Sequence, residues 1–274
     1  MITCTLMGGL GNQLFQIVTT ISYAIRTKKK FLFLGNEETL GMTKRTTYWN
    51  NLLKRLFPFL VKQIPLATLV KEIDFTYEDL TERVLSNKDS HLHGYFQSYK
   101  YFEHHFPSIY RMLNLDKQKE TLLMKSCASD VSLHFRIGDY LNLPTTYYIM
   151  TYEYYKSCMD YIIKKSKEPV THVMYFFEIG DMTEVMSIIV KLTEDFPEIW
   201  FRPVDHDLKD WEQLLLMSCC KHNIIANSTF SWWGAYLNQN ADKIVCYPDN
   251  WFKPEIKHNT KDLFPESWYK NKII

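Results

Sequence analysis

The chain has 274 residues, of which 46% are hydrophobic and 23% are charged, and its formal net charge is +1. This length suits one or two domains, because a domain usually holds about 100–200 residues. The balanced charge excludes the strong positive field with which proteins attract nucleic acids, so we expect no nucleic-acid partner.

The cysteines and the first residues bear on where the protein works. The six cysteines form neither a C-x-x-C pair nor a zinc-like spacing, which indicates reduced thiols in an intracellular protein. The start of the chain has no basic segment and is interrupted by Asn12, Gln13 and Gln16, so it does not resemble a signal peptide. No run of about 18 apolar residues occurs, and we therefore expect a soluble, cytoplasmic protein without a membrane span.

The first part of the chain has the pattern of a strand, a glycine turn, a helix and a second strand. Residues 2–7 are mostly apolar, Gly8–Gln13 is rich in glycine, and apolar residues recur at helical spacing from about Gln13 to Thr27. Residues 31–34 are the second apolar run. This βαβ order predicts a parallel sheet. Residues 40–90 are less regular, whereas residues 91–96 have the pattern of a strand and residues 101–113 and 117–126 that of helices.

The second part of the chain alternates strands with helices. Five apolar segments at 131–136, 172–177, 199–201, 223–226 and 243–247 are separated by segments of helical spacing, which is the pattern of a doubly wound sheet. We therefore predict an α/β fold of two Rossmann-type doubly wound domains, residues 1–128 and 129–274.

The glycine turn is a candidate ligand-binding segment. Gly9 and Gly11 match the first two glycines of the dinucleotide fingerprint, but Leu14 stands in place of the third. A helix N-terminus with Asn12 beside it remains, at the sheet edge where open α/β sheets bind ligands. The alternative interpretation is a structural turn with Asn12 as a helix cap.

The segment His134–Tyr140 is the second candidate, because it follows a short apolar strand and combines an imidazole, a guanidinium and a carboxylate. Arg136 offers a planar set of donors that suits phosphate oxygens. The alternative is that Arg136 forms a structural salt bridge with Asp139.

The third candidate segment begins after the strand at 223–226 and opens a helix. Four polar residues there could form a neutral cradle for an anion at the helix N-terminus, and these are Asn227, Ser228, Thr229 and Ser231. The alternative is that one hydroxyl caps the helix.

Asp205-His206-Asp207 has the residue types that bind divalent cations. Asp207, however, directly precedes a helical pattern that begins near Leu208, so we interpret it as an N-cap and predict no metal site.

Taken together, the segments 8–16, 134–140 and 227–237, with a fourth at 94–98, resemble the α-1,2-fucosyltransferase family, glycosyltransferase family 11. The resemblance implies a GT-B-like fold in which two Rossmann-type domains face a central cleft. It also implies a nucleotide-sugar donor, GDP-fucose, and a glycan acceptor whose hydroxyl, O2 of a terminal galactose, receives the sugar. The reaction would invert the anomeric carbon and need neither a metal nor another cofactor.

The same resemblance implies roles for individual residues. Arg136 would bind the donor diphosphate, with His134 and Asp139 shaping its loop and Asp139 as the candidate general base. Asn12, with Gly9 and Gly11, would lie near the sugar in an acceptor-side N-terminal domain. In the C-terminal domain the remaining donor-binding residues would be Asn227, Ser228, Thr229 and Ser231. Apart from the resemblance, Glu178 and Asp181 follow the strand at 172–177, and we expect them to contact the nucleoside of the donor.

Ile137 departs from the family pattern, which commonly has two consecutive arginines at positions 136 and 137. This departure leaves open a related transferase that uses another nucleotide-activated deoxyhexose. A non-catalytic protein that binds nucleotide sugars or glycans is the alternative from a different class.

Overall fold

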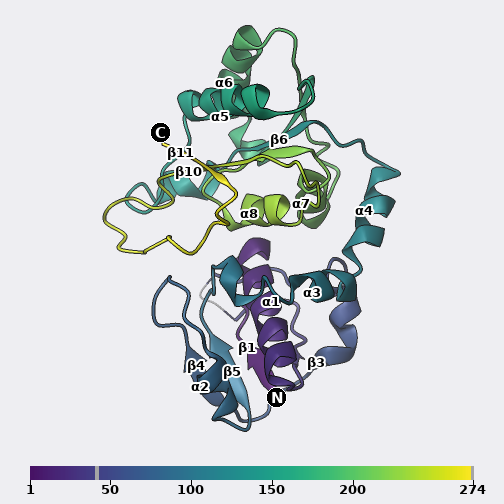
Figure 1. The fold of residues 1–274 in the computed structure, drawn as a ribbon, viewed down its shortest axis with the longest axis vertical. Helices are drawn as coiled ribbons and strands as arrows, with labels where there is room; N and C mark the ends of the chain where they lie inside the picture. Colours follow the sequence, from purple (N-terminus) through teal and green to yellow (C-terminus); the bar gives the residue numbers. More distant parts are fainter. Residues whose placement is uncertain (41–42, 273–274) are drawn as a thin grey trace. The chain divides into compact units, whose positions relative to one another are not determined.

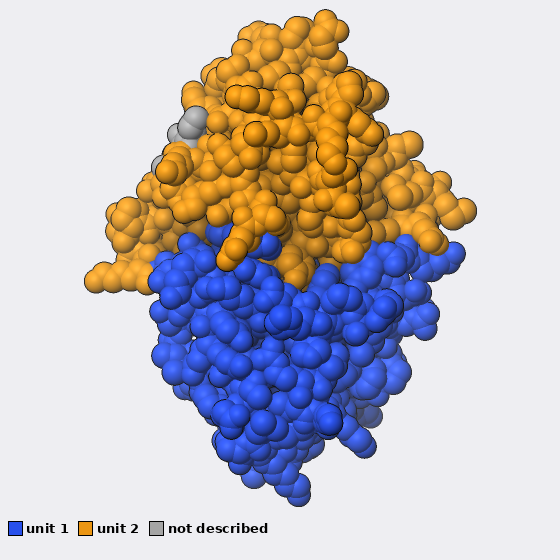
Figure 2. Space-filling model, viewed as in Figure 1, with its two compact units in different colours: residues 1–118, 258–265 blue, residues 119–257, 266–274 orange. Residues whose placement is uncertain are grey.

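The computed structural model describes residues 1–40 and 43–272 and divides the chain into two compact units. Unit 1 comprises Met1–Gln118 with His258–Pro265, and unit 2 comprises Lys119–Lys257 with Glu266–Ile274 (Figure 2). The division thus falls before the expected boundary at residue 128. The sequence pattern did not indicate that a segment near the C-terminus belongs to unit 1.

Unit 1 contains a sheet of three parallel strands in the order β1 (Ile2–Cys4), β5 (Ser90–His93) and β4 (Thr68–Lys71). A second parallel pair joins β2 (Phe33–Leu34) to β3 (Leu60–Val61). Helix α1 follows β1, and a parallel bridge then joins Ile2 to Phe31. The predicted βαβ opening is therefore confirmed.

Helix α1 (Leu10–Thr27) begins three residues earlier than predicted, directly after the N-cap residue Gly9. Asn12 consequently lies within the first helical turn, so the alternative interpretation of Asn12 as the helix cap is wrong. The helix ends where Lys28 adopts a left-handed conformation with φ 55°. Apart from Asn12, residues 10–24 are all buried, so α1 is enclosed on its polar side as well as its apolar side.

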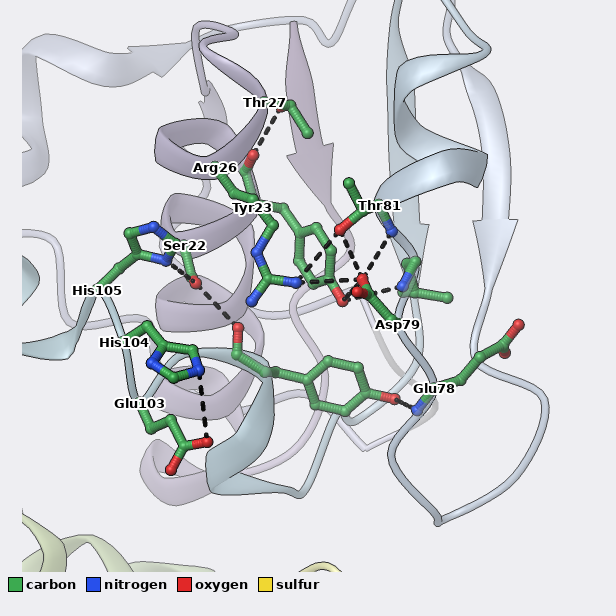
Figure 3. A network of polar contacts seen from close by, with 12 residues as sticks. Ser22, Tyr23, Arg26, Thr27, Glu78, Asp79, Thr81, Glu103, His104 and His105 are labelled. Carbon is green, nitrogen blue, oxygen red and sulfur yellow. Dashed lines mark hydrogen bonds and ion pairs between the residues drawn. The ribbon is translucent and has the colours of Figure 1, made fainter.

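Two polar side chains of α1, Ser22 and Arg26, form hydrogen bonds with neighbouring segments (Figure 3). Ser22 Oγ donates to the carbonyl of Tyr101 at 2.9 Å and contacts His105 Nδ1 at 3.0 Å. One turn along, Arg26 Nη1 donates to Asp79 Oδ1 at 3.1 Å. These contacts fix α1 in the unit, because an unpaired polar group at a buried position would cost about 1–3 kcal/mol.

The remaining elements of unit 1 are short. The irregular region between 40 and 90 contains β3, β4 and two helical segments, η1 (Lys54–Phe59) and α2 (Thr81–Leu85). After β5 come η2 (Tyr99–Tyr101), α3 (Phe106–Met112) and α4 (Leu115–Leu123), and the boundary between the units lies within α4.

The segment His258–Pro265 completes unit 1 through Asp262. The carbonyl of this residue accepts a hydrogen bond from Ser98 Oγ at 2.6 Å, and its carboxylate pairs with Lys100 Nζ at 2.5 Å. The backbone N–H of Tyr77 donates to the same carboxylate at 3.1 Å. One buried aspartate therefore joins three distant parts of the chain.

Unit 2 is built on a six-stranded sheet in the order β11 (Tyr269–Asn271), β10 (Val245–Pro248), β9 (His222–Ile224), β6 (Val131–His134), β7 (His172–Phe176) and β8 (Trp200–Pro203). All neighbouring pairs are parallel. Helices α5 (Tyr152–Lys165) and α6 (Met182–Asp195) lie on one face, and α7 (Asp210–Met217) and α8 (Thr229–Tyr236) lie on the other (Figure 1). The doubly wound pattern is confirmed, and β11 is an added edge strand that the sequence pattern did not predict.

Helix α8 is short, strongly buried and held at both ends. Ser228 caps its N-terminus by accepting a hydrogen bond from the N–H of Phe230 at 3.3 Å. At its C-terminus, Lys119 Nζ donates to the carbonyl of Leu237 and Lys243 Nζ to that of Ala235, where cations favour the helix dipole. Trp232 is fully buried and stacks on Tyr236 with ring centroids 4.7 Å apart.

Candidate active site

The strand order of unit 2 creates a topological switch point between β6 and β9. From β6 the chain proceeds outward to β7 and β8, and then returns to the other side of β6 to form β9, β10 and β11. Because the strands are parallel, the loops after β6 and β9 leave the sheet edge in opposite directions, which is where doubly wound sheets bind ligands. These two loops carry the candidate segments 134–140 and 227–231.

Direct contacts join the two candidate segments. Tyr140 Oη donates to the carbonyl of Asn227 at 2.9 Å, and the rings of His134 and Phe230 lie 5.6 Å apart. Tyr140 lies in the candidate segment, but no role was predicted for it. Its hydroxyl and ring make it the side chain that connects the β6 loop to the β9 loop.

Arg136 lies between carboxylates from two strand ends. Its Nη2 pairs with Asp139 Oδ1 at 2.6 Å, and its Nη1 pairs with Glu178, which follows β7. The guanidinium also lies over the ring of Tyr140, 5.3 Å from the centroid. The expected alternative of a salt bridge with Asp139 is therefore present in the structure, with Glu178 as a second partner.

The electrostatic balance keeps Arg136 charged. Burial disfavours the cation, but Glu178 and Asp139 outweigh it, so the pKa of Arg136 lies above its ordinary value. The guanidinium side chain is 23% exposed, whereas those of Asp139 and Glu178 are 46% and 59% exposed. A half-buried cation thus has partners that lie closer to solvent.

The segment that follows β7 holds the loop that carries Arg136. The N–H of Gly138 donates to both carboxylate oxygens of Asp181 at 3.0 Å. Asp181 is buried and ends the helical turn η4 (Ile179–Asp181), while Gly138 opens η3 (Gly138–Asn142). Asp181 therefore binds the backbone of the Arg136 loop.

His134 does not act as a second cation in this loop. Its side chain is buried at the end of β6, and its Nδ1 has no hydrogen-bond partner among the described residues. Burial, together with the nearby charge of Arg136, lowers the pKa of His134 from 6.5 to about 3. The imidazole is therefore neutral at physiological pH and can offer a hydrogen bond rather than a charge.

This buried imidazole makes stability depend on pH. Between pH 6.5 and about 3, the unfolded chain binds a proton at His134 that the folded chain does not bind. We therefore expect the free energy of unfolding to fall as the pH drops through this range, with a slope from this residue of up to about 1.4 kcal/mol per pH unit. Urea titrations of the wild type and of His134→Asn at several pH values measure the slope.

In that experiment His134→Asn should have a shallower pH dependence than the wild type. His104→Asn is the matched control, because the side chain of His104 is 76% exposed. Equal slopes for the wild type and His134→Asn would contradict the prediction.

The polar residues at the start of α8 are largely engaged in local bonds. Asn227 Nδ2 donates to the carbonyls of Tyr148 and Trp251 at 3.0 and 3.1 Å, while its buried Oδ1 has no partner among the described residues. Ser228 is the helix cap, and Ser231 Oγ donates back to the carbonyl of Ser228 at 3.3 Å. Thr229 is the first residue of the helix and is partly exposed.

In unit 1 the glycine turn precedes α1 at the carboxyl end of β1. Gly8 has φ 75°, a conformation that favours glycine, and a Cβ there would lie 2.4 Å from Asn12 Nδ2. Gly9 is the N-cap, and Gly11 is buried in the first turn. Asn12 Oδ1 accepts a hydrogen bond from Gln97 Nε2 at 2.9 Å.

The expectation that Asp207 caps the following helix is wrong. Helix α7 begins at Asp210, and the N–H of its N-cap residue Lys209 donates to Glu212 Oε2 at 2.9 Å. Asp205 Oδ1 instead accepts from the N–H of Asp207 at 2.9 Å, which forms a local turn. Across residues 1–40 and 43–272, no three His, Cys, Asp or Glu side chains are grouped as metal ligands.

A doubly wound sheet with an arginine-bearing loop at its switch point is an arrangement in which α/β proteins commonly bind ligands such as nucleotides. The chain belongs to glycosyl transferase family 11, because the model of that family matches residues 1–272. It is therefore a glycosyltransferase.

Curated relatives extend over nearly the whole chain. The O-antigen biosynthesis glycosyltransferase WbnK of Escherichia coli is 28% identical, over 96% of this chain and 98% of that protein. An α-1,2-colitosyltransferase of Escherichia coli is 26% identical, over 98% of each. A galactoside 2-α-L-fucosyltransferase of Caenorhabditis elegans is 23% identical, over 98% of this chain and 79% of that protein.

A solved structure of POFUT1 in complex with GDP-fucose shares the fold, with a TM-score of 0.50 and 11% identity over 90% of this chain and 97% of that one. The fold is accordingly GT-B-like, as the sequence predicted. Within the part of the chain that the structure describes, no helix is both long and apolar enough to cross a lipid bilayer.

Proposed function

We propose that this glycosyltransferase moves fucose from GDP-fucose to a hydroxyl of a glycan acceptor, O2 of a terminal galactose, with inversion and without a metal. Attack of the acceptor oxygen on the anomeric carbon breaks the bond to the diphosphate, which leaves as GDP. The relative named a galactoside 2-α-L-fucosyltransferase supports the transferred sugar and the linkage. The family resemblance of the segments 8–16, 134–140 and 227–237 supports them as well.

The observation that carries the proposal is the position of Arg136 at the switch point. Breaking the glycosidic bond places an additional negative charge on the diphosphate, and a preorganised donor at that place stabilises the transition state. Arg136 stays charged and presents a planar set of donors. The N-terminus of α8 in the neighbouring loop would contribute its backbone N–H groups and positive dipole end.

A diphosphate must compete with the carboxylates that hold Arg136. Asp139 and Glu178 are about half exposed, and ion pairs of exposed carboxylates are worth about 0–1 kcal/mol. A diphosphate offers more charge and a bidentate geometry, so it can replace one of them. In this proposal Glu178 then turns to the nucleoside, and Asp181 keeps the loop in place through the N–H of Gly138.

The general base is proposed to be Asp139, with orientation of Arg136 as its other role. The contact of 2.6 Å with Arg136 supports the orienting role. A base would impose an acidic limb on the pH–rate profile, because its protonated form cannot accept the hydroxyl proton. We expect Asp139→Asn to remove this limb, and a profile of unchanged shape would leave Asp139 with the orienting role alone.

A second donor remains a candidate because of Ile137. Its side chain is buried in the core of unit 2, where the family commonly has a second arginine. One relative is named an α-1,2-colitosyltransferase. Both facts favour testing another nucleotide-activated deoxyhexose beside GDP-fucose.

Thermal shift with GDP, UDP and dTDP tests the nucleotide. Among these nucleotides, we expect only GDP to raise the melting temperature. At a GDP concentration of 100 Kd, binding should add about 2.7 kcal/mol to the free energy of unfolding. Stabilisation by UDP or dTDP would contradict the proposed donor.

A hydrolysis assay across GDP sugars identifies the transferred sugar, because hydrolysis of the donor needs no acceptor. Activity that is retained in the presence of a chelator supports the metal-independent mechanism. Nucleotide binding without hydrolysis or transfer would point to the non-catalytic alternative.

A further inference from the structure

Glu72 makes two unusual contacts at the carboxyl edge of the sheet in unit 1. It follows β4 directly, and its own N–H donates to the carbonyl of His93 at 3.0 Å. Its carboxylate accepts hydrogen bonds from the N–H groups of Tyr95 at 2.7 Å and Phe96 at 2.9 Å. One side chain thus binds two consecutive backbone amides of the segment after β5.

The segment that Glu72 binds has a strained backbone. Phe96 has φ 53° and is fully buried, and a bulky residue in this conformation costs about 1–3 kcal/mol unless its surroundings impose it. Gly94 is equally constrained, because a Cβ there would lie 2.4 Å from Glu72 Cβ. Glu72 is therefore one of the contacts that impose the turn Gly94–Gln97.

The strained turn places the next side chain against the glycine turn of β1. Gln97 is 6% exposed, and its Nε2 donates to Asn12 Oδ1 at 2.9 Å. The other end of the amide, Gln97 Oε1, is buried and has no hydrogen-bond partner among residues 1–40 and 43–272. A buried acceptor of this kind usually has a partner, so the amide pair has an unfilled position for a donor group.

We propose that Glu72 is a positioning residue, which fixes the turn Gly94–Gln97 so that the amide pair of Asn12 and Gln97 binds a hydroxyl of the sugar substrate. This inference rests on the proposed function and on the expectation from the family resemblance that Asn12 lies near the sugar. An amide pair is neutral and offers both donors and acceptors, so it suits a hydroxyl group better than a phosphate.

The charge state of Glu72 is compatible with this role. Burial raises the pKa of Glu72 to about 6, although the hydrogen bonds from the two backbone N–H groups act to lower this pKa. At neutral pH the side chain is therefore still a carboxylate. Both oxygens can then accept the backbone N–H groups at once, which a neutral amide cannot do.

A double-mutant cycle between Glu72→Gln and Asn12→Ala tests the proposal. We expect each single change to lower kcat/KM for the acceptor by about tenfold to a hundredfold, as when a buried polar group loses its hydrogen-bond partner. Because both act on the same amide pair, the double variant should be no worse than Asn12→Ala alone. The affinity for GDP should be unchanged.

Glu72→Asp keeps both acceptor oxygens and should therefore recover part of the activity. This variant replaces Glu72→Gln in the cycle if Glu72→Gln does not fold.

Glu82→Gln is the matched control, since it removes an exposed carboxylate of unit 1. Losses that multiply in the double variant would overturn the proposal, as would an equal loss in Glu82→Gln. A wild type that transfers no sugar would instead overturn the proposed function. In that case the positioning role of Glu72 is tested by NMR, through the side-chain amide signals of Gln97. Identical signals in the wild type and in Glu72→Gln would overturn that role.

Discussion

An Arg136→Ala variant is expected to lose about 10²–10³-fold in transfer rate, the usual effect of removing a preorganised donor from a developing anion. In the proposed reaction the leaving diphosphate would gain charge next to Arg136, the one guanidinium of the segment 134–140, because Ile137 stands where the family pattern commonly has another arginine. His134 cannot replace that charge, because its pKa is lowered to about 3. The rate of fucose transfer and the affinity for GDP measure the effect.

The fold of Arg136→Ala should survive. Its ion pairs involve carboxylates that are about half exposed, and such pairs contribute about 0–1 kcal/mol. Arg136→Lys should show an intermediate loss, because a lysine keeps the charge but not the planar set of donors. Arg111→Ala removes an exposed arginine of α3 and serves as the control. A fully active Arg136→Ala enzyme would disprove the role given to this residue.

A Trp232→Ala variant is expected to lower the free energy of unfolding of unit 2 by about 3–5 kcal/mol, the range for large aromatic truncations in a core. Trp232 has no exposed surface, stacks on Tyr236 and lies 5.5 Å from the ring of Trp268. The cavity would lie beneath α8, whose first turn carries Phe230, 5.6 Å from the ring of His134. Transfer activity should therefore be lost at a lower temperature than in the wild type.

Trp200→Ala is the matched control for this prediction, because Trp200 is 60% exposed on the edge strand β8. Its removal should cost much less than that of Trp232, since little area is returned to water. Chemical denaturation of both variants measures the difference. Equal losses of stability would show that α8 is not held by its aromatic packing.

The candidate site of unit 2 could be predicted because its signals are local. An apolar strand followed by Arg136, and another followed by Asn227, suffice to place both loops at the carboxyl edge of a parallel sheet. The neutral state of His134 could not be predicted, because it depends on burial by Phe230 and on the charge of Arg136. The engagement of Ser231 with the carbonyl of Ser228 depends on backbone geometry in the same way.

The features that were missed or wrongly predicted depend on how the chain packs and where its helices begin, which local patterns do not reveal. Glu72 lies in an irregular region, and its partners Tyr95 and Phe96 are recognised only when β4 and β5 are paired. The start of α1 was placed too late because Gly11 and Asn12 are poor helix formers, whereas the packing of the buried helix decides the boundary. Asp207 was misassigned because α7 begins only at Asp210, after a local turn in which the N–H of Asp207 donates to Asp205.

The position of Asp262 has a consequence for the synthesis of the protein. Ser98, Lys100 and Tyr77 all bond to this residue, yet the ribosome makes it more than a hundred residues after Gln118, the end of the first segment of unit 1. Domains generally fold as units while the chain emerges, but unit 1 cannot be completed until nearly the whole chain has been made. A nascent chain that stops at Lys257 would lack both the segment of unit 1 that carries Asp262 and strand β11 of unit 2, which makes the late steps of translation the period in which the chain needs protection from aggregation.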